Sequence, residues 1–331
     1  MGRATIKDVA ELAGVSKATV SHVVNNTRFV EDGTRQRVLH IIDQLGYQPS
    51  LIARSLTTNQ TKTIGVIVSD VSNIFFGDVL HGIEDITRPA GYSIVVCNTD
   101  EILEREDYFI GLLLRQRVDG IIAAATSREW DTLGKAKFQH TPIVFVDRMY
   151  EGLAGAYVGV DNFKGAYDGT EYIISRGHTK IGILAGFQCL STMCERLAGF
   201  RQSLKDHSIP LPDEWLVESP LNIKAGKEAA LHLLSLPNRP SAILSNNNLL
   251  SLGALLAINE LHLRCPEDIA LVGFDDHPWA AVSSPPLTVI RQPSWLVGQK
   301  AAEILFNLIE EKKVEQTPVL LDCDLVIRQS C

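Results

Sequence analysis

Apolar side chains recur at helical spacing within residues 5–24, on either side of a short turn. The apolar positions are Ile6, Val9, Ala10, Ala13, Val20, Val23 and Val24. They would give each of two short helices one buried face, with Gly14, Val15 and Ser16 between the helices. Ser16 is a good N-cap, and the second helix would expose small and polar side chains that suit a major groove about 12 Å wide. The pattern predicts a helix-turn-helix DNA reader; the alternative is a small helical bundle that binds nothing.

The next two segments extend this small domain. Residues 34–45 form a third amphipathic pattern that ends at Gly46, so three helices would close a minimal core. Residues 50–58 contain helix-forming residues but are too few for a stable isolated helix. We expect a hinge helix that is completed by a second copy and by DNA, with Leu56 as an apolar wedge in the minor groove. The alternative is a plain interdomain linker.

From Thr61 onward the pattern changes to short apolar runs separated by helix-length segments. The runs are TIGVIVSD, YSIVVCN, RVDGIIAA, PIVFVD, KIGILAG, SAILSN and IALVGFDD, and the helical segments include residues 75–88, 162–176 and 249–261. This alternation predicts an α/β fold with doubly wound parallel sheets covered by helices on both faces. About 270 residues of it favour two lobes, each with its own sheet.

Polar and aromatic side chains follow these runs. They are Asn73, Phe75, Phe76, Asp147, Arg148, Arg196, Asn247, Asp275 and Gln292, with Arg196 expected to open a helix. Ligands of open α/β sheets bind beyond the carboxyl ends of the strands. Carboxylates, guanidinium groups and amides beside aromatic faces suit a hydroxyl-rich ligand. A structural role is as good an interpretation for any one of these residues, but their convergence at strand ends indicates a binding pocket.

Composition and charge agree with a DNA-binding regulator. The chain has 331 residues, 45% of them hydrophobic, and a net charge of −8. Residues 1–62 hold 8 Lys and Arg against 5 Asp and Glu, a balance of +3, so the remainder carries −11. The cationic excess therefore lies where DNA would bind, and the acidic total argues against indiscriminate binding of polyanions.

Membrane, metal and cofactor signals are missing from the sequence. The first seven residues contain no apolar run, and no stretch approaches the roughly 18 apolar residues of a spanning helix. Six cysteines occur without a CxxC or a zinc-type cluster, so we expect reduced thiols, mostly in the core. The sequence predicts a cytoplasmic protein, associated with the nucleoid through DNA binding, that carries no metal and no cofactor.

The motifs TIKDVA, GVS, TVSHVVN, TRFV, TR, LGY, P and ARSL, in this order within residues 5–56, closely resemble the headpiece and hinge of the LacI/GalR (lactose/galactose repressor) family. The likeness to the headpieces of purine repressors is especially close. By position, the resemblance implies that Lys17, Ala18 and His22 read bases and that Leu56 is the wedge. The full set of DNA-contacting residues that it implies is Thr5, Ser16, Lys17, Ala18, Thr19, Ser21, His22, Asn25, Arg28, Tyr47, Ala53 and Leu56.

Residues 61–331 resemble the effector domain of the same family, which shares its fold with periplasmic sugar-binding proteins. The polar set after the strands is similar to that of ribose-binding proteins, which implies a pentose or related monosaccharide as effector. Leu190 and Leu221, also implied at the site, stand where purine repressors carry an arginine and a phenylalanine, and this disfavours a purine corepressor. The region around VSNIFF and GIEDI is similar to catabolite control proteins, but Glu303 replaces an arginine with which those bind a phosphorylated carrier protein.

The resemblance implies a domain plan and a mechanism. We expect a headpiece in residues 1–48, a hinge in 49–61, an N-lobe of 62–161 with 292–321, and a C-lobe of 162–291 with 322–331. Ligand-dependent closure of the lobes would control pairing of the hinges in a homodimer on a near-palindromic operator. No heptad repeat follows LVIRQS, so we expect a dimer rather than a tetramer. Control by a corepressor or a protein coregulator remains an alternative, as does a cytosolic sugar-binding module without regulatory action.

An enzyme is the competing class of function. Asp275-Asp276-His277 suggests a catalytic or metal site, and Ser16, Ser21 and His22 suggest a nucleophile with its base. The sequence contains no GxxxxGK, GxSxG or HExxH motif, and the Asp pair has no second ligand cluster at motif spacing. We therefore expect no catalysis.

Overall fold

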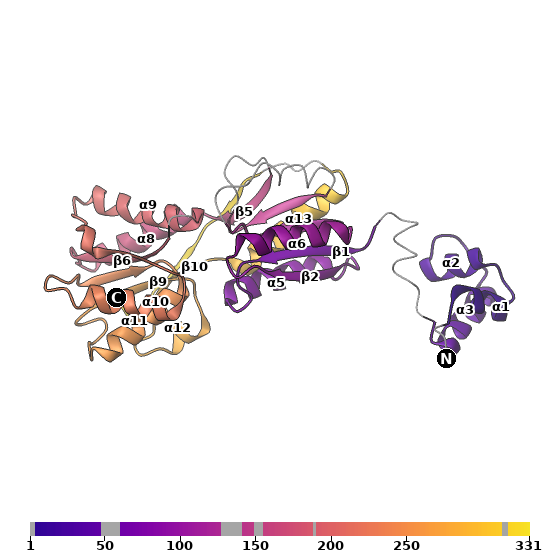
Figure 1. Ribbon diagram of the computed structural model, residues 1–331, viewed down its shortest axis with the longest axis horizontal. Helices are drawn as coiled ribbons and strands as arrows, with labels where there is room; N and C mark the ends of the chain where they lie inside the picture. The colour runs from indigo at the N-terminus through magenta and orange to yellow at the C-terminus, as the bar shows by residue number, and fades with distance from the viewer. Residues whose placement is uncertain (1–3, 48–59, 127–140, 149–154, 188–189, 313–316) are drawn as a thin grey trace. The chain divides into compact units, whose positions relative to one another are not determined.

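The computed structural model describes residues 4–47, 60–126, 141–148, 155–187, 190–312 and 317–331 (Figure 1). The chain divides into residues 1–62, called the headpiece unit below, and residues 63–331, called the core unit. Nearly all of the expected hinge, including Ala53 and Leu56, lies outside the described residues.

The headpiece unit contains the helices α1 (Ile6–Ala13), α2 (Lys17–Asn25) and α3 (Asp32–Leu45). Val9, Val20 and Val38, one from each helix, are fully buried in a shared apolar cluster. Gly14 ends α1 in the left-handed conformation at φ 64°, which glycine adopts at little cost. The helix-turn-helix prediction is confirmed.

Helix α3 begins two residues before the predicted start at Thr34. The backbone N–H of Arg35 donates to the carbonyl of Glu31 at 2.9 Å, so helical hydrogen bonding already begins at Glu31. The carboxylate of Asp32 in this first turn interacts favourably with the helix dipole. The sequence analysis placed the helix start after Gly33, because glycine is a poor helix former.

The first sheet of the core unit has the strand order β11-β5-β4-β3-β1-β2, and all of these pairs are parallel. Its strands are β1 (Thr63–Val68), β2 (Ser93–Asn98), β3 (Gly120–Ala123), β4 (Ile143–Val146), β5 (Ala156–Val160) and β11 (Val319–Leu321). Its helices are α5 (Ile74–Thr87), α6 (Leu103–Arg115) and α13 (Ser294–Ile309). Val66 lies in the apolar cluster with α5 and α13, while Ile67 lies in the cluster with α6, so helices cover both faces.

The second sheet has the order β12-β10-β9-β8-β6-β7. Its strands are β6 (Ile181–Gly186), β7 (Leu216–Ser219), β8 (Ala242–Ser245), β9 (Ala270–Phe274), β10 (Thr288–Arg291) and β12 (Asp324–Val326). The helical segments here are α8 (Asn162–Ser175), α9 (Ser191–Asp206), a 3-10 turn (Asp213–Trp215), α10 (Ile223–Leu234), α11 (Asn248–Glu260) and α12 (Pro278–Val282). Two buried clusters again lie on opposite faces of the sheet. We call each sheet with its helices a lobe, and the expected pair of α/β lobes is confirmed.

The chain passes between the lobes three times, after β5, after β10 and after β11. The crossing segments are neighbours between the two sheets (Figure 1): the backbone N–H of Asp161 donates to the carbonyl of Leu321 at 2.9 Å, and Arg291 pairs with Asp324 at 3.1 Å. The crossings bring the carboxyl ends of β4 and β9, from different sheets, to one shared pocket.

Helices α5 and α13 pack at unusually close range in the first lobe. A Cβ on Gly298 would clash with the carbonyl of Val79, and a Cβ on Gly82 would clash with the carbonyl of Trp295. Reciprocal glycines therefore allow the two backbones to touch. This contact fixes α5, whose first turn lines the pocket.

Several strands were absent from the sequence prediction. The structure adds β5, β7, β10, β11 and β12, which have three to five residues each. Runs this short carry little periodicity, and β11 and β12 are only partly buried. Strand β12 also pairs antiparallel with β10, in contrast to the expected all-parallel arrangement.

Among the described residues, no helix combines the length and apolar character needed to span a bilayer.

Candidate functional site: the reading helix and the interlobe pocket

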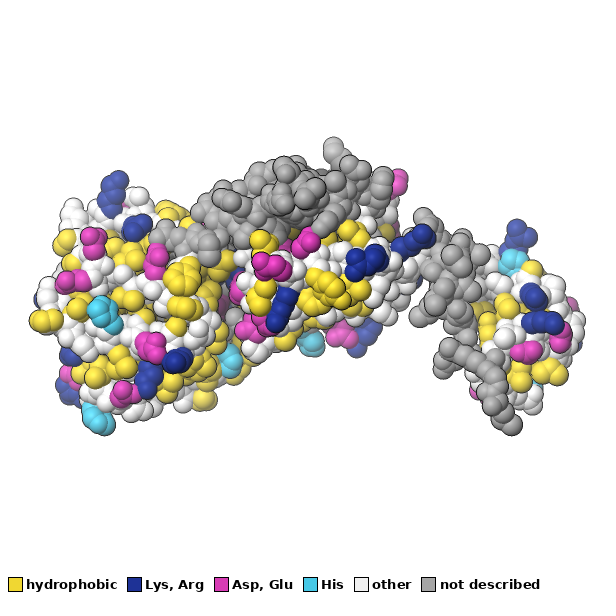
Figure 2. Space-filling model, viewed as in Figure 1, with side chains coloured by type: hydrophobic (Ala, Val, Ile, Leu, Met, Phe, Trp, Pro, Cys, Tyr) yellow, Lys and Arg dark blue, Asp and Glu magenta, His cyan; other side chains and the backbone are white. Residues whose placement is uncertain are grey.

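The exposed side of α2 begins at its N-cap. Ser16 Oγ accepts the backbone N–H of Thr19 at 3.0 Å, and the two hydroxyls lie 2.9 Å apart. This cap starts the helix so that Lys17 and Ala18 are exposed on its first turn. Figure 2 shows the headpiece unit with lysine and arginine side chains on its visible face.

The second half of α2 holds its polar side chains in local hydrogen bonds. Asn25 Nδ2 donates to the carbonyl of Ser21 at 3.0 Å and to its Oγ at 3.2 Å. His22 Nδ1 lies 2.8 Å from Thr27 Oγ1, which orients the imidazole. Ser21, His22 and Asn25 are therefore positioned along one helix rather than free to reorient.

The other predicted DNA-contacting residues have mixed surroundings. Thr5 forms a capping box with Asp8 at the start of α1. Arg28 is exposed in the loop after α2, and Tyr47 packs against the headpiece core. Sequence reasoning assigned no role to Phe29, although its side chain is 93% exposed beside Arg28. Both residues belong to the motif TRFV, which was the available signal in the sequence for a role of Phe29.

A cavity of about 470 Å³ lies between the two lobes of the core unit, and we call it the interlobe pocket. All ten residues expected to bind an effector line it: Asn73, Phe75, Phe76, Asp147, Arg148, Arg196, Leu221, Asn247, Asp275 and Gln292. They come from loops and helix starts that follow the strands of both sheets. Sequence reasoning missed other lining residues, which include Asp70, Asp100, Glu101, Thr126, Phe187, Thr192 and Met193.

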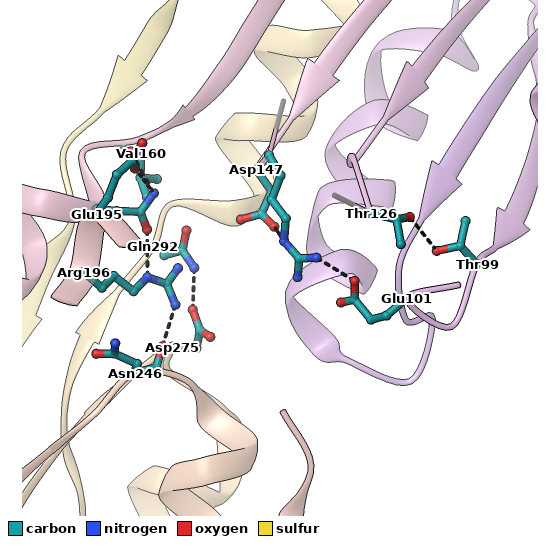
Figure 3. A network of polar contacts seen from close by, with 12 residues as sticks. Thr99, Glu101, Thr126, Asp147, Val160, Glu195, Arg196, Asn246, Asp275 and Gln292 are labelled. Carbon is teal, nitrogen blue, oxygen red and sulfur yellow. Dashed lines mark hydrogen bonds and ion pairs between the residues drawn. The ribbon is translucent and has the colours of Figure 1, made fainter. Parts of the chain in front are cut away.

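Arg196 is held rigidly on the second-lobe side of the pocket. Its Nε donates to Asn162 Oδ1 at 2.8 Å, and its Nη1 donates to the carbonyl of Asn246 at 2.6 Å (Figure 3). Its guanidinium also lies 3.6 Å above the ring centre of Phe274, a cation–π contact. The expectation that Arg196 opens its helix is wrong: α9 begins at Ser191, five residues earlier, because the backbone N–H groups of Met193 and Cys194 already donate to the carbonyl of Leu190.

The other lobe contributes a charged group at the end of β4. Arg148 Nη1 donates to Glu101 Oε2 at 2.7 Å, and Arg148 Nε lies 3.1 Å from Asp147 Oδ2. Figure 3 shows Glu101 and Asp147 on this side of the pocket, opposite Arg196, Asp275 and Gln292. Burial raises the pKa of Asp147, although Arg148 and Arg196 oppose the increase.

Backbone strain accompanies these acidic residues. Asp147 and Asp275, which directly follow β4 and β9, have φ values of 60° and 74°, in the left-handed region that non-glycine residues rarely adopt. Glu101 is also left-handed, at φ 59°. Such strain concentrates at binding sites, where the surrounding structure maintains it.

Neutral polar and aromatic groups complete the lining. Gln292 Nε2 donates to Asp275 Oδ1 at 2.5 Å, which fixes both side chains. The rings of Phe75 and Phe76 meet edge to face with centres 5.1 Å apart. Asn247 caps α11 through its side chain, which accepts the backbone N–H of Leu250 at 2.9 Å.

The alternative catalytic groups are engaged in structural contacts. Asp276 pairs with Arg328 at 2.8 Å, and His277 accepts the backbone N–H of Trp279 as the cap of α12. His22 bonds to Thr27 rather than to either serine. Within the described part of the chain, no three His, Cys, Asp or Glu side chains gather in a way that would hold a metal ion.

Comparison with known proteins agrees with this architecture. Residues 5–50 match the model for bacterial regulatory proteins of the lacI family, and residues 170–331 match a periplasmic binding protein-like domain. The HTH-type transcriptional repressor PurR of Photobacterium profundum is 37% identical over 99% of this chain and 98% of its own length.

Two solved structures are also similar. A structure described as a ribose operon repressor from Burkholderia thailandensis is 36% identical, with a TM-score of 0.74 over 80% of this chain and 98% of its own. The lac repressor dimer bound to operator and the anti-inducer ONPF is 30% identical, with a TM-score of 0.90 over 99% of both chains.

A helix-turn-helix unit followed by a two-lobed binding domain defines a DNA-binding regulator with an effector domain. The chain belongs to the lacI family of bacterial regulatory proteins. It is a DNA-binding transcriptional repressor and not an enzyme, as predicted.

Proposed function

We propose that this repressor is a homodimer whose binding to a near-palindromic operator is controlled by a pentose or related monosaccharide in the interlobe pocket. Lys17, Ala18 and His22 read bases in this proposal. The remaining DNA contacts come from Thr5 before α1, from Tyr47 after α3, and from the cap and rest of α2, the loop after it and the hinge. The lac repressor dimer on its operator, similar over the whole chain, supports this assembly. The lobe boundaries at residues 161, 291 and 321 belong to the same proposal.

One observation carries the ligand class. Carboxylates, guanidinium groups and amides from both lobes surround a single cavity of about 470 Å³ that also contains the rings of Phe75 and Phe76. A monosaccharide needs donors and acceptors for its hydroxyls and an apolar face for its C–H groups. The pocket supplies both, and its size is within the range of small-molecule sites.

A purine corepressor is the second candidate, because the curated relatives carry the name PurR. Leu190 and Leu221 oppose it, since neither side chain offers the hydrogen bonds or the aromatic face that a flat heterocycle uses. The 36% identical structure that is described as a ribose operon repressor instead favours a pentose.

The ligand acts by differential affinity for two arrangements of the lobes. A sugar that prefers the arrangement incompatible with hinge pairing is an inducer, and one that prefers the other is a corepressor. A switch from 1:99 to 99:1 needs on the order of 5.5 kcal/mol of differential binding. The sign follows from whether ligand addition weakens or strengthens operator binding.

The test is a thermal-shift screen of the full chain against monosaccharides, their phosphates and purine bases. A ligand at 100 times its dissociation constant stabilises the folded state by about 2.7 kcal/mol. Stabilisation by a pentose supports the proposal, and stabilisation by hypoxanthine or guanine overturns it. Operator release or capture is then measured by fluorescence anisotropy on a duplex selected from a random pool with the ligand-free protein.

A further inference from the structure

Acidic side chains outnumber basic ones in the interlobe pocket. Among the described lining residues, Asp70, Asp100, Glu101, Asp147 and Asp275 face two arginines, and the lining contains no lysine or histidine. A phosphate ester would bring up to two further negative charges into this acidic cavity. The phosphate would be repelled by the neighbouring carboxylates, and this repulsion is strong where water is partly excluded.

Both arginines are already engaged. Arg196 donates to Asn162 and to the carbonyl of Asn246, and its face lies on the Phe274 ring. Arg148 is paired with Glu101 and with Asp147. Phosphate is bound best by a guanidinium that can present two parallel N–H groups. A phosphate that approached Arg148 would have to compete with the Glu101 carboxylate at Nη1.

Of the two carboxylates that pair with Arg148, Glu101 is the one that can be substituted without disturbing buried packing. Its side chain is 38% exposed, whereas the side chain of Asp147 is 7% exposed. Glu101 belongs to the loop between β2 and α6, which follows a predicted strand but from which the sequence analysis selected no residue. Glu101 has a left-handed backbone, and its carboxylate accepts a hydrogen bond from Arg148 in the pocket.

We propose that Glu101 is a specificity-determining residue that makes the interlobe pocket accept a neutral monosaccharide and reject its phosphate ester. The inference rests on the proposed function and adds the charge state of the ligand. Glu101 acts in two ways: its carboxylate occupies Nη1 of Arg148, and its own charge repels a phosphate near the same guanidinium. A neutral sugar is compatible with both effects, because its hydroxyls can donate to the carboxylates.

The test compares D-ribose with D-ribose 5-phosphate by isothermal titration calorimetry on the full chain. The wild type should bind ribose at least 10-fold more tightly than the phosphate ester. Glu101→Gln should reduce this ratio at least 10-fold, mainly by improving affinity for the ester. Glu101→Asp keeps the charge and should keep a ratio near that of the wild type. Glu104→Gln, an equal charge change at an exposed site on the first turn of α6, should leave the ratio unchanged.

The outcomes separate this inference from the proposed function. An unchanged ratio in Glu101→Gln, or a wild type that binds both compounds equally, overturns the role of Glu101 while the pentose effector stands. A wild type that binds neither compound, in a protein that still binds its operator, rejects ribose as the effector and the inference with it. Operator binding by each variant verifies that it is folded.

Discussion

Asn248 donates through Nδ2 to Oδ1 of Asn73 at 3.0 Å and so joins the two lobes across 175 positions of sequence. Asn248 opens α11 in the second lobe, and Asn73 caps α5 in the first. The same Oδ1 of Asn73 also accepts the backbone N–H of Phe75 at 3.2 Å, so one oxygen both starts a pocket-lining helix and bridges the lobes. The closeness of the lobes is therefore coupled to the shape of the pocket.

Removal of this bridge should weaken effector binding. Asn248→Ala deletes one interlobe hydrogen bond, and a typical net value of about 1 kcal/mol corresponds to an approximately fivefold higher Kd for the effector. Calorimetry on the variant tests this, with small-angle scattering to detect wider separation of the lobes. Asn259→Ala, at an exposed position near the other end of α11, is the control and should change neither quantity. Equal affinity for wild type and Asn248→Ala would show that the bond does not contribute to closure.

Effector response should depend on Asp275. Its carboxylate accepts from Gln292 at 2.5 Å at the pocket wall, so Asp275→Ala removes an acceptor and releases a second polar side chain. We expect loss of ligand-dependent change in operator binding, with basal operator affinity within about threefold of wild type, because the headpiece unit is a separate folded unit. Anisotropy titrations with and without ligand measure both. Asp206→Ala, exposed at the end of α9, should respond as the wild type does; a normal response in Asp275→Ala would remove this residue from the site.

The sequence predicted the fold well where its patterns were long. The faces of α1 and α2 together have seven apolar positions at helical spacing, whereas runs such as TIGVIVSD are continuously apolar and buried over most of their length. The two kinds of element were therefore distinct in the sequence. Strands β11 and β12 have three residues each, and β12 begins with Asp324. Their pairing with β5 and β10 depends on contacts between distant segments, which local periodicity does not contain.

The site was predictable to the extent that it lies directly after strands. Asp147 and Asp275 each follow a buried apolar run, so the strand-end rule located both. Glu101 follows an edge strand through a short loop and resembles any other surface carboxylate in sequence. Its pairing with Arg148, 47 positions later, is a product of tertiary structure.

Two cysteine thiols should resist modification in the folded protein. Partial burial raises the pKa of Cys265 and of Cys323 to about 12, from an ordinary value of 9.0. At pH 8 only on the order of 10⁻⁴ of each is thiolate, the form that reacts with iodoacetamide. Mass spectrometry after a short reaction should find both unmodified in the native protein and alkylated in urea. Because the unfolded thiols ionise first, they should also reduce the free energy of unfolding as the pH rises from about 9 towards 12. Rapid native alkylation of either cysteine would contradict its raised pKa.

The close contact of α5 and α13 gives a stability prediction with an internal control. Gly298→Ala places a methyl group against the carbonyl of Val79, and the helices must separate to accept it. We expect a loss of about 1 to 3 kcal/mol in free energy of unfolding, the usual range for overpacking. Gly77→Ala on α5 meets nothing within 4 Å and should be neutral or stabilising by up to about 1 kcal/mol, since alanine favours the helix. Urea denaturation of both variants measures the difference, and equal stabilities would mean that the backbones are not in contact.

Base reading by α2 should be separable from phosphate binding. Lys17 is exposed on the first turn, and His22 is oriented by Thr27, so both are positioned to meet base edges. Lys17→Ala or His22→Ala should change the preferred base at particular operator positions, with about 1 to 3 kcal/mol of discrimination lost at each. Binding to a library of single-base operator variants measures this pattern. Lys7→Ala, which removes an exposed lysine paired with Glu11 on α1, is the control and should leave base preference unchanged. A uniform loss of affinity across the library for Lys17→Ala or His22→Ala would assign that side chain to the phosphate backbone instead.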